Sequence, residues 1–349
     1  MKNAFPTIQI SGTKEEAAQQ TAEQLGPMAH KLLQFREDLL PGMLPEGSQM
    51  PSEPFWKQLY EIHLTSTHYS AIESKAFAEK LGKEPGYILA MSGMSDFLDY
   101  MFFSGQGELG CSTLSLPKEI SPELGFVQTW DLHLDVEKYS IVMHRQVEGC
   151  YASICLTTAL GHGHFGVNEH GICVGTNNLQ CLHPRPGVVF AAAIQEVLDS
   201  ASTAQEALEI FSKLPFMSGH NFIVAAPDSP TLNIEQSTKG IHVTPVEQKC
   251  FPHTNHYLHP PLQAFGRMYS TSSQPRYQFL LEASKKLSPD ANLANFKRIF
   301  SDHTAPICRH TDDPTDAATC GLIAFHPRQR QLSIIKGRVC QGEWETYTL

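Results

Sequence analysis

No stretch of the sequence stays apolar over the roughly 18 residues that a membrane-spanning helix needs. The N-terminal sequence MKNAFPTIQISGTKEEAAQQ also lacks the apolar run of roughly 7–15 residues that marks a secretory signal peptide. These two absences predict a soluble protein of the cytoplasm that does not have a membrane as its partner.

Charge is sparse and is biased toward one sign. Charged residues make up 18% of the chain, the formal net charge is −10, and no run of five like charges occurs. A nucleic-acid binder needs a basic face for the phosphates, so we expect no nucleic-acid partner. The 349 residues are 41% hydrophobic, which is enough for a sizeable core in one large or two ordinary domains.

Cysteine patterns that would define a framework are also missing. The chain has 9 cysteines, an odd number, and none of them form a CxxC pair. The spacing therefore signals neither a disulfide framework nor a zinc site, and in a reducing compartment most of these side chains are expected to be small buried hydrophobes. We expect no cofactor and no metal.

Two common catalytic motifs do not apply. The chain has no GxSxG elbow, which argues against a serine hydrolase. The stretch Gly105–Gly110 matches GxGxxG by letter, but a helical stretch precedes it and no helix follows, so we interpret it as a flexible loop rather than a dinucleotide site. HxxH spacing without a nearby acidic helix motif does not define a metal site. A histidine-based metal hydrolase nevertheless stays open as an alternative, built on His162, His164 or His256.

Helical patterns dominate up to residue 110. Thr13 and Glu16 form a capping-box pattern, and apolar residues follow at helical spacing. Further helical stretches are predicted at about Glu73–Lys80 and Met91–Phe103. Prolines are predicted to break this region at Pro41, Pro45, Pro51 and Pro54. We predict a mainly helical N-terminal segment over residues 1–110 and a second domain over residues 111–349.

After Gly110 the pattern changes to short strands and helices. The turn Asn168–Gly171 separates two of the strands, and helices are predicted at Phe190–Asp199 and Ala204–Lys213. The predicted order is strands, helices, strands, helices, strands. This order does not alternate as in a βαβ fold, so it indicates an α+β fold of antiparallel sheets with helices outside them. The remaining predicted elements are strands at Phe126–Trp130, Ser140–Arg145, Ala152–Thr157, Phe165–Val167, Ile172–Thr176, Asn221–Ala226, Leu232–Gln236, Ile241–Pro245, Leu322–Phe325 and Gln331–Lys336, and helices at Gln274–Lys285 and Leu293–Ser301.

One cysteine stands out by its position. Cys111 directly follows Gly110, at the point where the helical region ends and the strand region begins. Twenty residues later, an apolar strand ends in Trp130 and the carboxylate Asp131. A cysteine in this context is a candidate nucleophile.

At these residues the chain resembles the peptidase C45 group, the acyl-coenzyme A:6-aminopenicillanic acid acyltransferases, within the N-terminal-nucleophile superfamily that includes bile salt hydrolases. The resemblance rests on an ordered series of short motifs. The family's Asn before Trp-Asp is Thr129 here. The series comprises Gly110-Cys111-Ser112, Thr129-Trp130-Asp131, Asn168-Glu169-His170-Gly171, Gly175-Thr176-Asn177-Asn178, His253-Thr254-Asn255-His256, Ser273 with Arg276, and Ile307-Cys308-Arg309-His310.

The resemblance implies an N-terminal-nucleophile αββα sandwich and a chain that cuts itself between Gly110 and Cys111. Asn255 is then expected to stabilise the oxyanion, with Asn177 helping or orienting it, and Asp131 to hold the new amine and thiol. The resemblance also suggests Trp130, His256 and Arg309 as substrate-binding residues. It implies an acyl-Cys intermediate, a linear amide or acyl thioester as small-molecule substrate, two associated fragments, and a possible homo-oligomer.

Cutting the chain would create the catalytic base. A free α-amine has a pKa of about 7.7–8, against about 8.5 for a thiol, so the amine of Cys111 would accept the thiol proton near neutral pH. Two alternatives remain beside the amidohydrolase and the metal enzyme: an acyl-coenzyme A-dependent N-acyltransferase, and a binding protein that kept the fold without catalysis.

Overall fold

A computed structural model describes residues 4–101, 110–267, 271–289 and 291–349. The described residues form an eight-stranded sheet, in the order β1-β4-β5-β6-β7-β8-β9-β10, and a six-stranded sheet, in the order β11-β2-β3-β12-β13-β14. The strands are β1 Thr7–Gly12, β2 Thr113–Ser115, β3 Phe126–His133, β4 Ser140–Val147, β5 Ser153–Thr158, β6 Phe165–Asn168, β7 Cys173–Asn178, β8 His220–Ala225, β9 Thr231–Ser237, β10 Gly240–Val246, β11 Phe251–His253, β12 Ala317–His326, β13 Gln331–Lys336 and β14 Glu345–Thr348.

Ten α-helices lie within the same described ranges, and a short 3-10 helix covers Leu134–Tyr139. The first five fall before the gap that starts at residue 102, which agrees with the predicted helical character of that segment. The helices are α1 Lys14–Met43, α2 Glu53–Ser66, α3 His68–Leu81, α4 Pro85–Ser92, α5 Met94–Tyr100, α6 Phe190–Ser200, α7 Ala204–Lys213, α8 Pro260–Gln263, α9 Ser273–Ser284 and α10 Leu293–Phe300.

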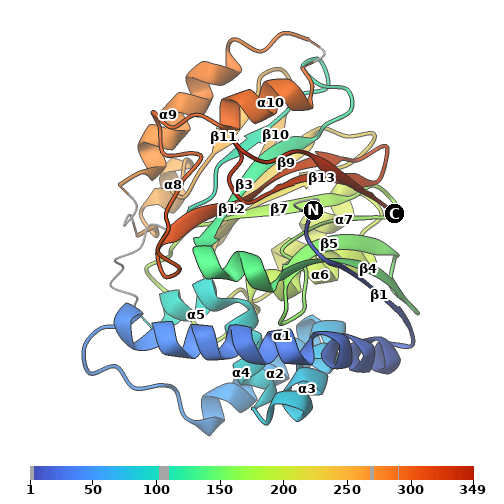
Figure 1. The fold of residues 1–349 in the computed structure, drawn as a ribbon, viewed down its shortest axis with the longest axis vertical. Helices are drawn as coiled ribbons and strands as arrows, with labels where there is room; N and C mark the ends of the chain where they lie inside the picture. Colours follow the sequence, from blue (N-terminus) through green and yellow to red (C-terminus); the bar gives the residue numbers. More distant parts are fainter. Residues whose placement is uncertain (1–3, 102–109, 268–270, 290) are drawn as a thin grey trace.

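The two sheets pack face to face because their strands carry apolar side chains on both sides. In β3, Phe126 points into the core between the sheets, whereas the next residue, Val127, packs toward α9 and α10. In β4, Val142 lies between the sheets, and Ile141 packs toward the helices on the outer side of the larger sheet. The result is helices, sheet, sheet and helices in sequence, which confirms the predicted αββα sandwich (Figure 1).

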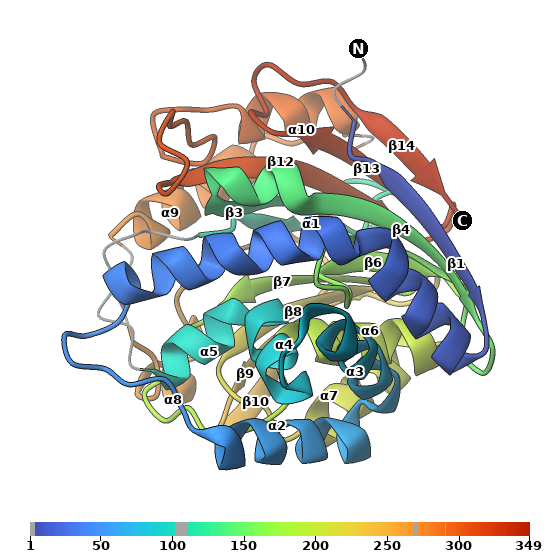
Figure 2. The same ribbon diagram turned by 60° about the horizontal axis from the view of Figure 1, so that its bottom comes forward.

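The N-terminal helices extend the core on the side of the larger sheet. Helices α1 to α5 share one apolar cluster with α6 and α7, and Figure 2 shows α1 running lengthwise beside the smaller helices. The capping box of Thr13 and Glu16 is confirmed at the start of α1. Helices α1 to α5 are therefore packed into the same core as the sheets.

The prediction that Pro41 breaks the helix is wrong. Both Pro27 and Pro41 lie inside α1. Each ring removes one backbone N–H, but both prolines face solvent, so water can reach the carbonyl groups that lose a partner. The buried stripe on the opposite face, which includes Leu25, Leu32 and Leu40, holds the helix together through these positions. Pro54 also falls inside a helix, in the first turn of α2, where proline is tolerated.

The prediction of purely antiparallel sheets is wrong at one edge. Strand β1 pairs with β4 in parallel, with Thr7 opposite Val142 and Gly12 opposite Val147. Ile10 is the one fully buried side chain of this strand. The run Thr7-Ile8-Gln9-Ile10-Ser11 alternates polar and apolar residues, but it is short and has only two apolar side chains.

The predicted strands and helices after residue 110 are confirmed with boundaries within a few residues. Most of the loop Gly105–Gly110 lies outside the described residues, as does the end of the predicted helix Met91–Phe103. No helix in the described part of the chain combines the length and apolar character that a membrane crossing requires.

Candidate active site

Residues far apart in the sequence meet around Cys111. The cysteine lies just before β2, which pairs with β3 on one side and with β11 on the other. Asp131 is in β3, Asn255 follows β11, and Arg276 is in α9. Pairing of β2 with β11 places Thr113 opposite His253, which brings Asn255 to the start of β2.

Cys111 is held by the partly buried amide of Asn255 and the fully buried guanidinium of Arg276. The Cys111 N–H donates to Asn255 Oδ1 at 3.0 Å, and Arg276 Nη2 donates to the same oxygen at 2.8 Å. Arg276 Nη1 donates to the Cys111 carbonyl at 2.8 Å and to Ser112 Oγ at 3.0 Å. Arg276 is completely buried, so these contacts fix the backbone of Cys111 from two directions.

Gly110 is a glycine because there is no room for a side chain. A Cβ added to Gly110 would lie 2.5 Å from Arg276 Nη2 and 3.0 Å from Asn255 Oδ1. The peptide bond between Gly110 and Cys111 therefore passes directly against the Arg276–Asn255 pair. Any larger residue at position 110 would displace that pair.

The thiol of Cys111 is neutral in the continuous chain. Burial raises its pKa to about 12, and the negative charge of Asp131 adds to this effect. A thiol with this pKa needs a base before it can attack as thiolate.

Asp131 is a buried carboxyl without a hydrogen-bond partner among the described residues, and this holds for both of its side-chain oxygens. Burial raises its pKa to about 7, partly offset by Arg276, by the nearby Thr319 hydroxyl and by Arg309. An orphaned carboxyl of this kind is unusual in a core and marks a place where a cationic group would fit.

Asn177 and Asn178 point to different neighbours. Asn177 Oδ1 accepts hydrogen bonds from Thr113 Oγ1 at 3.0 Å and from Asn221 Nδ2 at 3.2 Å. The backbone carbonyl of Asn178 accepts from Asn255 Nδ2 at 3.0 Å. Asn178, which was not among the predicted site residues, is thus the direct contact of Asn255, and Asn177 supports the start of β2.

A partly open cavity lies in front of Cys111. Asp131, Asn178 and Asn255 contribute to its wall beside the cysteine. The rest is mostly apolar, with Met94, Leu98, Trp130, Val136, Phe165 and Phe190. This combination of an apolar wall and a few polar groups is typical of a small-molecule site.

One charged group stands out in this wall. Arg36 of α1 lines the cavity, is 4% exposed and donates to the Met91 carbonyl. No carboxylate among the described residues forms an ion pair with it. Burial lowers its pKa to about 10, so the guanidinium stays protonated at neutral pH. The nearby His133 and His164 are neutral there, because burial lowers their pKa values to about 4 and about 3.

The three predicted substrate-binding residues occupy different places. Trp130 lines the cavity and packs edge-on against Phe165. His256 is not among the lining residues; its Nδ1 lies 2.7 Å from Ser273 Oγ, which accepts the N–H of Asn255 at 2.9 Å. Arg309 lies behind Asp131, where its backbone pairs with Thr319.

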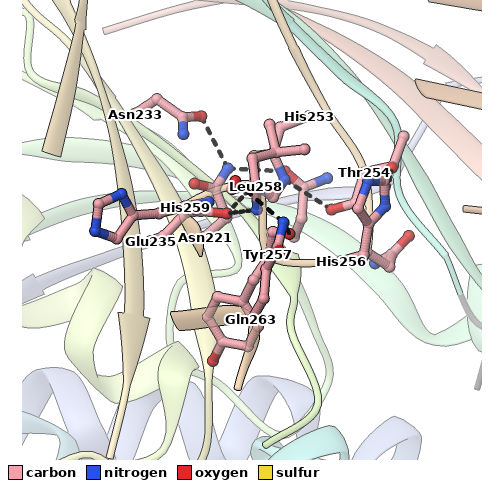
Figure 3. Close-up of polar contacts among 12 residues, drawn as sticks. Asn221, Asn233, Glu235, His253, Thr254, His256, Tyr257, Leu258, His259 and Gln263 are labelled. Atoms are coloured by element: carbon pink, nitrogen blue, oxygen red, sulfur yellow. Dashed lines mark hydrogen bonds and ion pairs between the residues drawn. The ribbon is translucent and has the colours of Figure 1, made fainter. Parts of the chain in front are cut away.

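The loop that carries Asn255 is anchored by Glu235 of β9 (Figure 3). One carboxylate oxygen lies 3.0 Å from His253 Nε2 and accepts the Leu258 N–H at 2.5 Å, and the other accepts the His259 N–H at 2.8 Å. Burial favours the neutral acid, yet these bonds together hold the pKa of Glu235 below its ordinary value. The anchored loop fixes Asn255 in front of Cys111.

We expect Glu235→Gln to destabilise the fold. The neutral amide loses the charge-assisted bonds, and its NH2 group meets backbone N–H donors, so the free energy of unfolding should fall by about 2–3 kcal/mol. Urea unfolding followed by circular dichroism measures this as a lower midpoint. Glu247→Gln, at an exposed position nearby, serves as control and should change the midpoint little. Equal midpoints for the two variants would contradict the anchoring role.

His162 and His253, which the sequence offered as possible metal ligands, form ion pairs with glutamates instead. His162 Nδ1 pairs with Glu73 Oε2 at 2.7 Å, and His253 pairs with Glu235. Among the described residues, none of the three histidines of the metal-hydrolase alternative belongs to a group of metal-ligand side chains.

The roles of Arg276 and Arg36 were not predicted from the sequence. Arg276 was noted as part of a motif, but the contact with Cys111 spans 165 positions of the sequence and has no local signal. Arg36 lies on the buried face of α1 at helical spacing from Leu32 and Leu40. A cation within that apolar stripe was the feature of the sequence that could have indicated a functional role.

No curated protein sequence matches the chain. Among solved structures, a mutant of conjugated bile acid hydrolase from Clostridium perfringens aligns with 13% identity and a TM-score of 0.43, over 68% of this chain and 97% of that one. Penicillin V acylase from Agrobacterium tumefaciens aligns with 13% identity and a TM-score of 0.33, over 69% and 78%.

The decisive match comes from a family model. The model described as acyl-coenzyme A:6-aminopenicillanic acid acyl-transferase matches residues 121–339, which is more than half of the chain. It spans Asp131, Asn177, Asn255 and Arg276, four of the residues gathered around Cys111. The chain therefore belongs to the acyl-coenzyme A:6-aminopenicillanic acid acyl-transferase family.

Proposed function

We propose that this chain is a self-processing cysteine hydrolase or acyltransferase that acts on a linear amide through an acyl-Cys111 intermediate. One observation carries the proposal. The Gly110–Cys111 peptide bond lies against Asn255 and the buried Arg276, and next to a buried carboxyl, Asp131, whose two oxygens accept no hydrogen bond among the described residues. This arrangement suits a reaction in which the peptide bond is first cleaved by way of a thioester, and the freed amine and thiol of Cys111 then act on a substrate.

Processing starts with attack of Cys111 Sγ on the carbonyl carbon of Gly110. The C–N bond of the peptide breaks as a C–S bond forms, and the nitrogen of Cys111 takes up a proton to become an amine. Water then hydrolyses the thioester, which releases a carboxylate at Gly110 and restores the thiol. Two fragments result, residues 1–110 and 111–349, which β1–β4 pairing and the shared apolar cluster would hold together.

The freed amine is the base for the second reaction. Its pKa of about 7.7–8 lies close to neutral pH, and it sits on the same residue as the thiol. Asp131 supplies the negative charge that an ammonium group at this position needs, and an ammonium neighbour would in turn lower the pKa of the thiol. The orphaned carboxyl of the continuous chain thus gains its partner on cleavage.

Acyl transfer follows with balanced steps. The amine removes the thiol proton, sulfur attacks the substrate carbonyl, and the amide nitrogen leaves with that proton. Water, activated by the same amine, then attacks the thioester and frees the acid. A primary amide has two N–H donors, so Asn255 Nδ2 retains one after its bond to Asn178 and could donate it to the oxyanion.

The acceptor decides between hydrolysis and transfer. Water resolves the acyl-enzyme of an amidohydrolase, whereas an amine does so in an acyl-coenzyme A-dependent N-acyltransferase. The cavity is partly open, which favours access of water. Product analysis with an amide or an acyl thioester as donor, with and without added amine, separates the two reactions.

Arg36 indicates a substrate that carries a negative charge. It is a buried guanidinium in the wall of the cavity, with no ion-pair partner among the described residues. A buried cation without a counter-ion is costly, and a carboxylate on the substrate would offset that cost while fixing its orientation. We therefore propose an acyl amide with an apolar body and an anionic group.

We expect Arg36→Met to weaken use of anionic substrates selectively. Two amide substrates are compared that differ only by a carboxylate in one and a neutral carboxamide in the other. Loss of a charged hydrogen bond should lower kcat/KM for the anionic substrate by about 10- to 100-fold, and change it little for the neutral one. An equal decrease for both substrates would show that Arg36 is only structural.

We also expect a pH signature of Asp131 in the uncut chain, measured in a Cys111→Ala background. Its folded pKa of about 7 lies above the ordinary value, so the folded state binds more protons between about pH 4 and pH 7. The Asp131 contribution to stability is therefore lost as pH rises through this window. An added Asp131→Asn change removes that loss, so the denaturant midpoint of the Asn chain should rise relative to the Asp chain up to about pH 7 and then stay level. A pH-independent difference would contradict the raised pKa.

Intact-mass measurement of freshly purified wild-type protein tests the proposal. We expect two fragments whose masses place the cut between Gly110 and Cys111, and a transient mass increase of the larger fragment by one acyl group in the presence of substrate. A single full-length mass that persists in active protein would overturn the proposal.

A further inference from the structure

Four side chains of metal-ligand type meet away from the cavity. His303, Cys308 and His310 lie in the segment between α10 and β12, and Cys340 lies in the turn between β13 and β14. Their ligand atoms all lie within 4.8 Å of one another. None of the four lines the cavity beside Cys111.

The distances approach those of a tetrahedral site. His310 Nε2 lies 3.3 Å from Cys308 Sγ and 3.3 Å from Cys340 Sγ. Zinc–sulfur bonds of about 2.3 Å and zinc–nitrogen bonds of about 2.0–2.1 Å at tetrahedral angles place neighbouring ligand atoms about 3.5 Å apart. Small rotations of the side chains would bring all four onto one ion.

The orientation of His303 adds a second, independent observation. Its Nδ1 lies 3.0 Å from the carbonyl oxygen of Cys308, which fixes the ring and favours a proton on Nδ1. Nε2 is then unprotonated and free to coordinate. A histidine ligand typically donates its other ring N–H to a backbone carbonyl in this way.

The donor set selects the metal class. Two thiols and two imidazoles are ligands of zinc in structural sites, and calcium or magnesium would require oxygen ligands. All nine cysteines are free thiols in the structure. A disulfide between Cys308 and Cys340 would use the two sulfurs and give no reason for an imidazole nitrogen equally close to both.

We propose that His303, Cys308, His310 and Cys340 bind one Zn²⁺ ion in a structural Cys₂His₂ site. Both thiols lose their protons on binding, so each zinc ion taken up releases about two protons. The ion joins the segment before β12 to the turn after β13. This proposal does not depend on the proposed function.

The site also supports the back of the catalytic centre. Arg309 stands between two of the ligands, and its N–H donates to Thr319 Oγ1 at 2.9 Å. Thr319 is the register partner of Asp131 in the neighbouring strand. Zinc thus fixes the segment whose Arg309 charge acts on the Asp131 carboxyl.

Metal analysis of the full-length protein, produced with zinc in the medium and purified without chelator, tests the site. Inductively coupled plasma mass spectrometry should find about one zinc per chain in the wild type and less than about a tenth in Cys340→Ser. Cys250→Ser is the matched control, because Cys250 is also partly buried but lies outside the cluster, and it should retain the zinc. Cobalt substitution should give thiolate-to-cobalt charge-transfer bands in the wild type and lose them in Cys340→Ser.

A second variant and a stability measurement guard against misfolding. His303 is exposed, so His303→Asn should fold and yet lose most of the zinc. A chelator should lower the Tm of the wild type by about 4 °C or more and leave the Tm of Cys340→Ser unchanged. Absence of zinc from the wild type even after addition of zinc, equal zinc in Cys340→Ser, or a Cys308–Cys340 disulfide found by peptide mass would each overturn the proposal.

Discussion

Cys111→Ala is expected to remain one polypeptide of full length and to lose amide turnover. Without the sulfur, the carbonyl of Gly110 is not attacked, no thioester forms and the α-amine that serves as base is never freed. Removal of a nucleophile from a catalytic unit costs on the order of 10⁴- to 10⁶-fold in kcat. Intact mass and a substrate-hydrolysis assay on the same sample measure both losses together.

Two further variants show whether the loss of chain cleavage and turnover is due to the missing sulfur of Cys111. Cys111→Ser keeps an oxygen nucleophile, which is less acidic and less nucleophilic than sulfur, so it should be cut slowly and accumulate as precursor. Cys250→Ala changes another partly buried cysteine and should be cut and active like the wild type. Fragments from Cys111→Ala would mean that a different group or an added protease cuts the chain.

Much of the fold was accessible from the sequence because its strands and helices carry clear periodic patterns. The strands β3 to β10 and the helices α6 and α7 were predicted within a few residues. The strands that were missed are short and carry few apolar side chains. Strands β2 and β11 are three residues long, and β1 buries Ile10 but few other side chains, so tertiary pairing rather than local preference decides their conformation.

The residues of the site could be predicted from the sequence only where they stand next to one another in short motifs. Gly110, Cys111, Trp130 and Asp131 stand in recognisable local motifs, and the structure brings them to one cavity. Asn255 Nδ2 donates to the backbone carbonyl of Asn178, and a motif of side chains gives no signal for such a contact. The expected help from Asn177 in stabilising the oxyanion stays a prediction.

The same limit applies to the proposed zinc site. Known zinc motifs place cysteines two to four positions apart, whereas here Cys308 and Cys340 are separated by 32 positions (340 − 308) and meet only through the pairing of β12 with β13. Motifs defined by short spacing in the sequence cannot detect ligands that are brought together by the pairing of strands. The sequence-based expectation of no metal site stays a prediction, which the zinc measurement proposed above tests.

Arg276→Met should cause the largest loss of any change outside Cys111, because one buried side chain holds several acceptors at once. Its guanidinium donates to the Cys111 carbonyl, to Ser112 Oγ and to Asn255 Oδ1. Methionine fills similar volume but leaves these buried acceptors without donors, which should cost about 3–5 kcal/mol of stability. Displacement of Asn255 from Cys111 should lower kcat by on the order of 10²- to 10³-fold.

Arg276→Lys separates charge from geometry. Lysine keeps the positive charge but is a point donor that cannot bridge Cys111 and Asn255 as the planar guanidinium does. If the bridge positions the nucleophile, the Lys chain should recover part of the stability while kcat and the rate of chain cleavage stay low, and KM should change little. Full recovery of kcat in the Lys chain would show that charge alone suffices, and an unchanged kcat in the Met chain would show that Arg276 is dispensable for positioning Cys111. The same three hydrogen bonds stabilise the fold, by satisfying buried acceptors, and support catalysis, by positioning Cys111 and Asn255. The decisive comparison is therefore the kcat of the Lys and Met chains, measured on protein that has been shown to be folded.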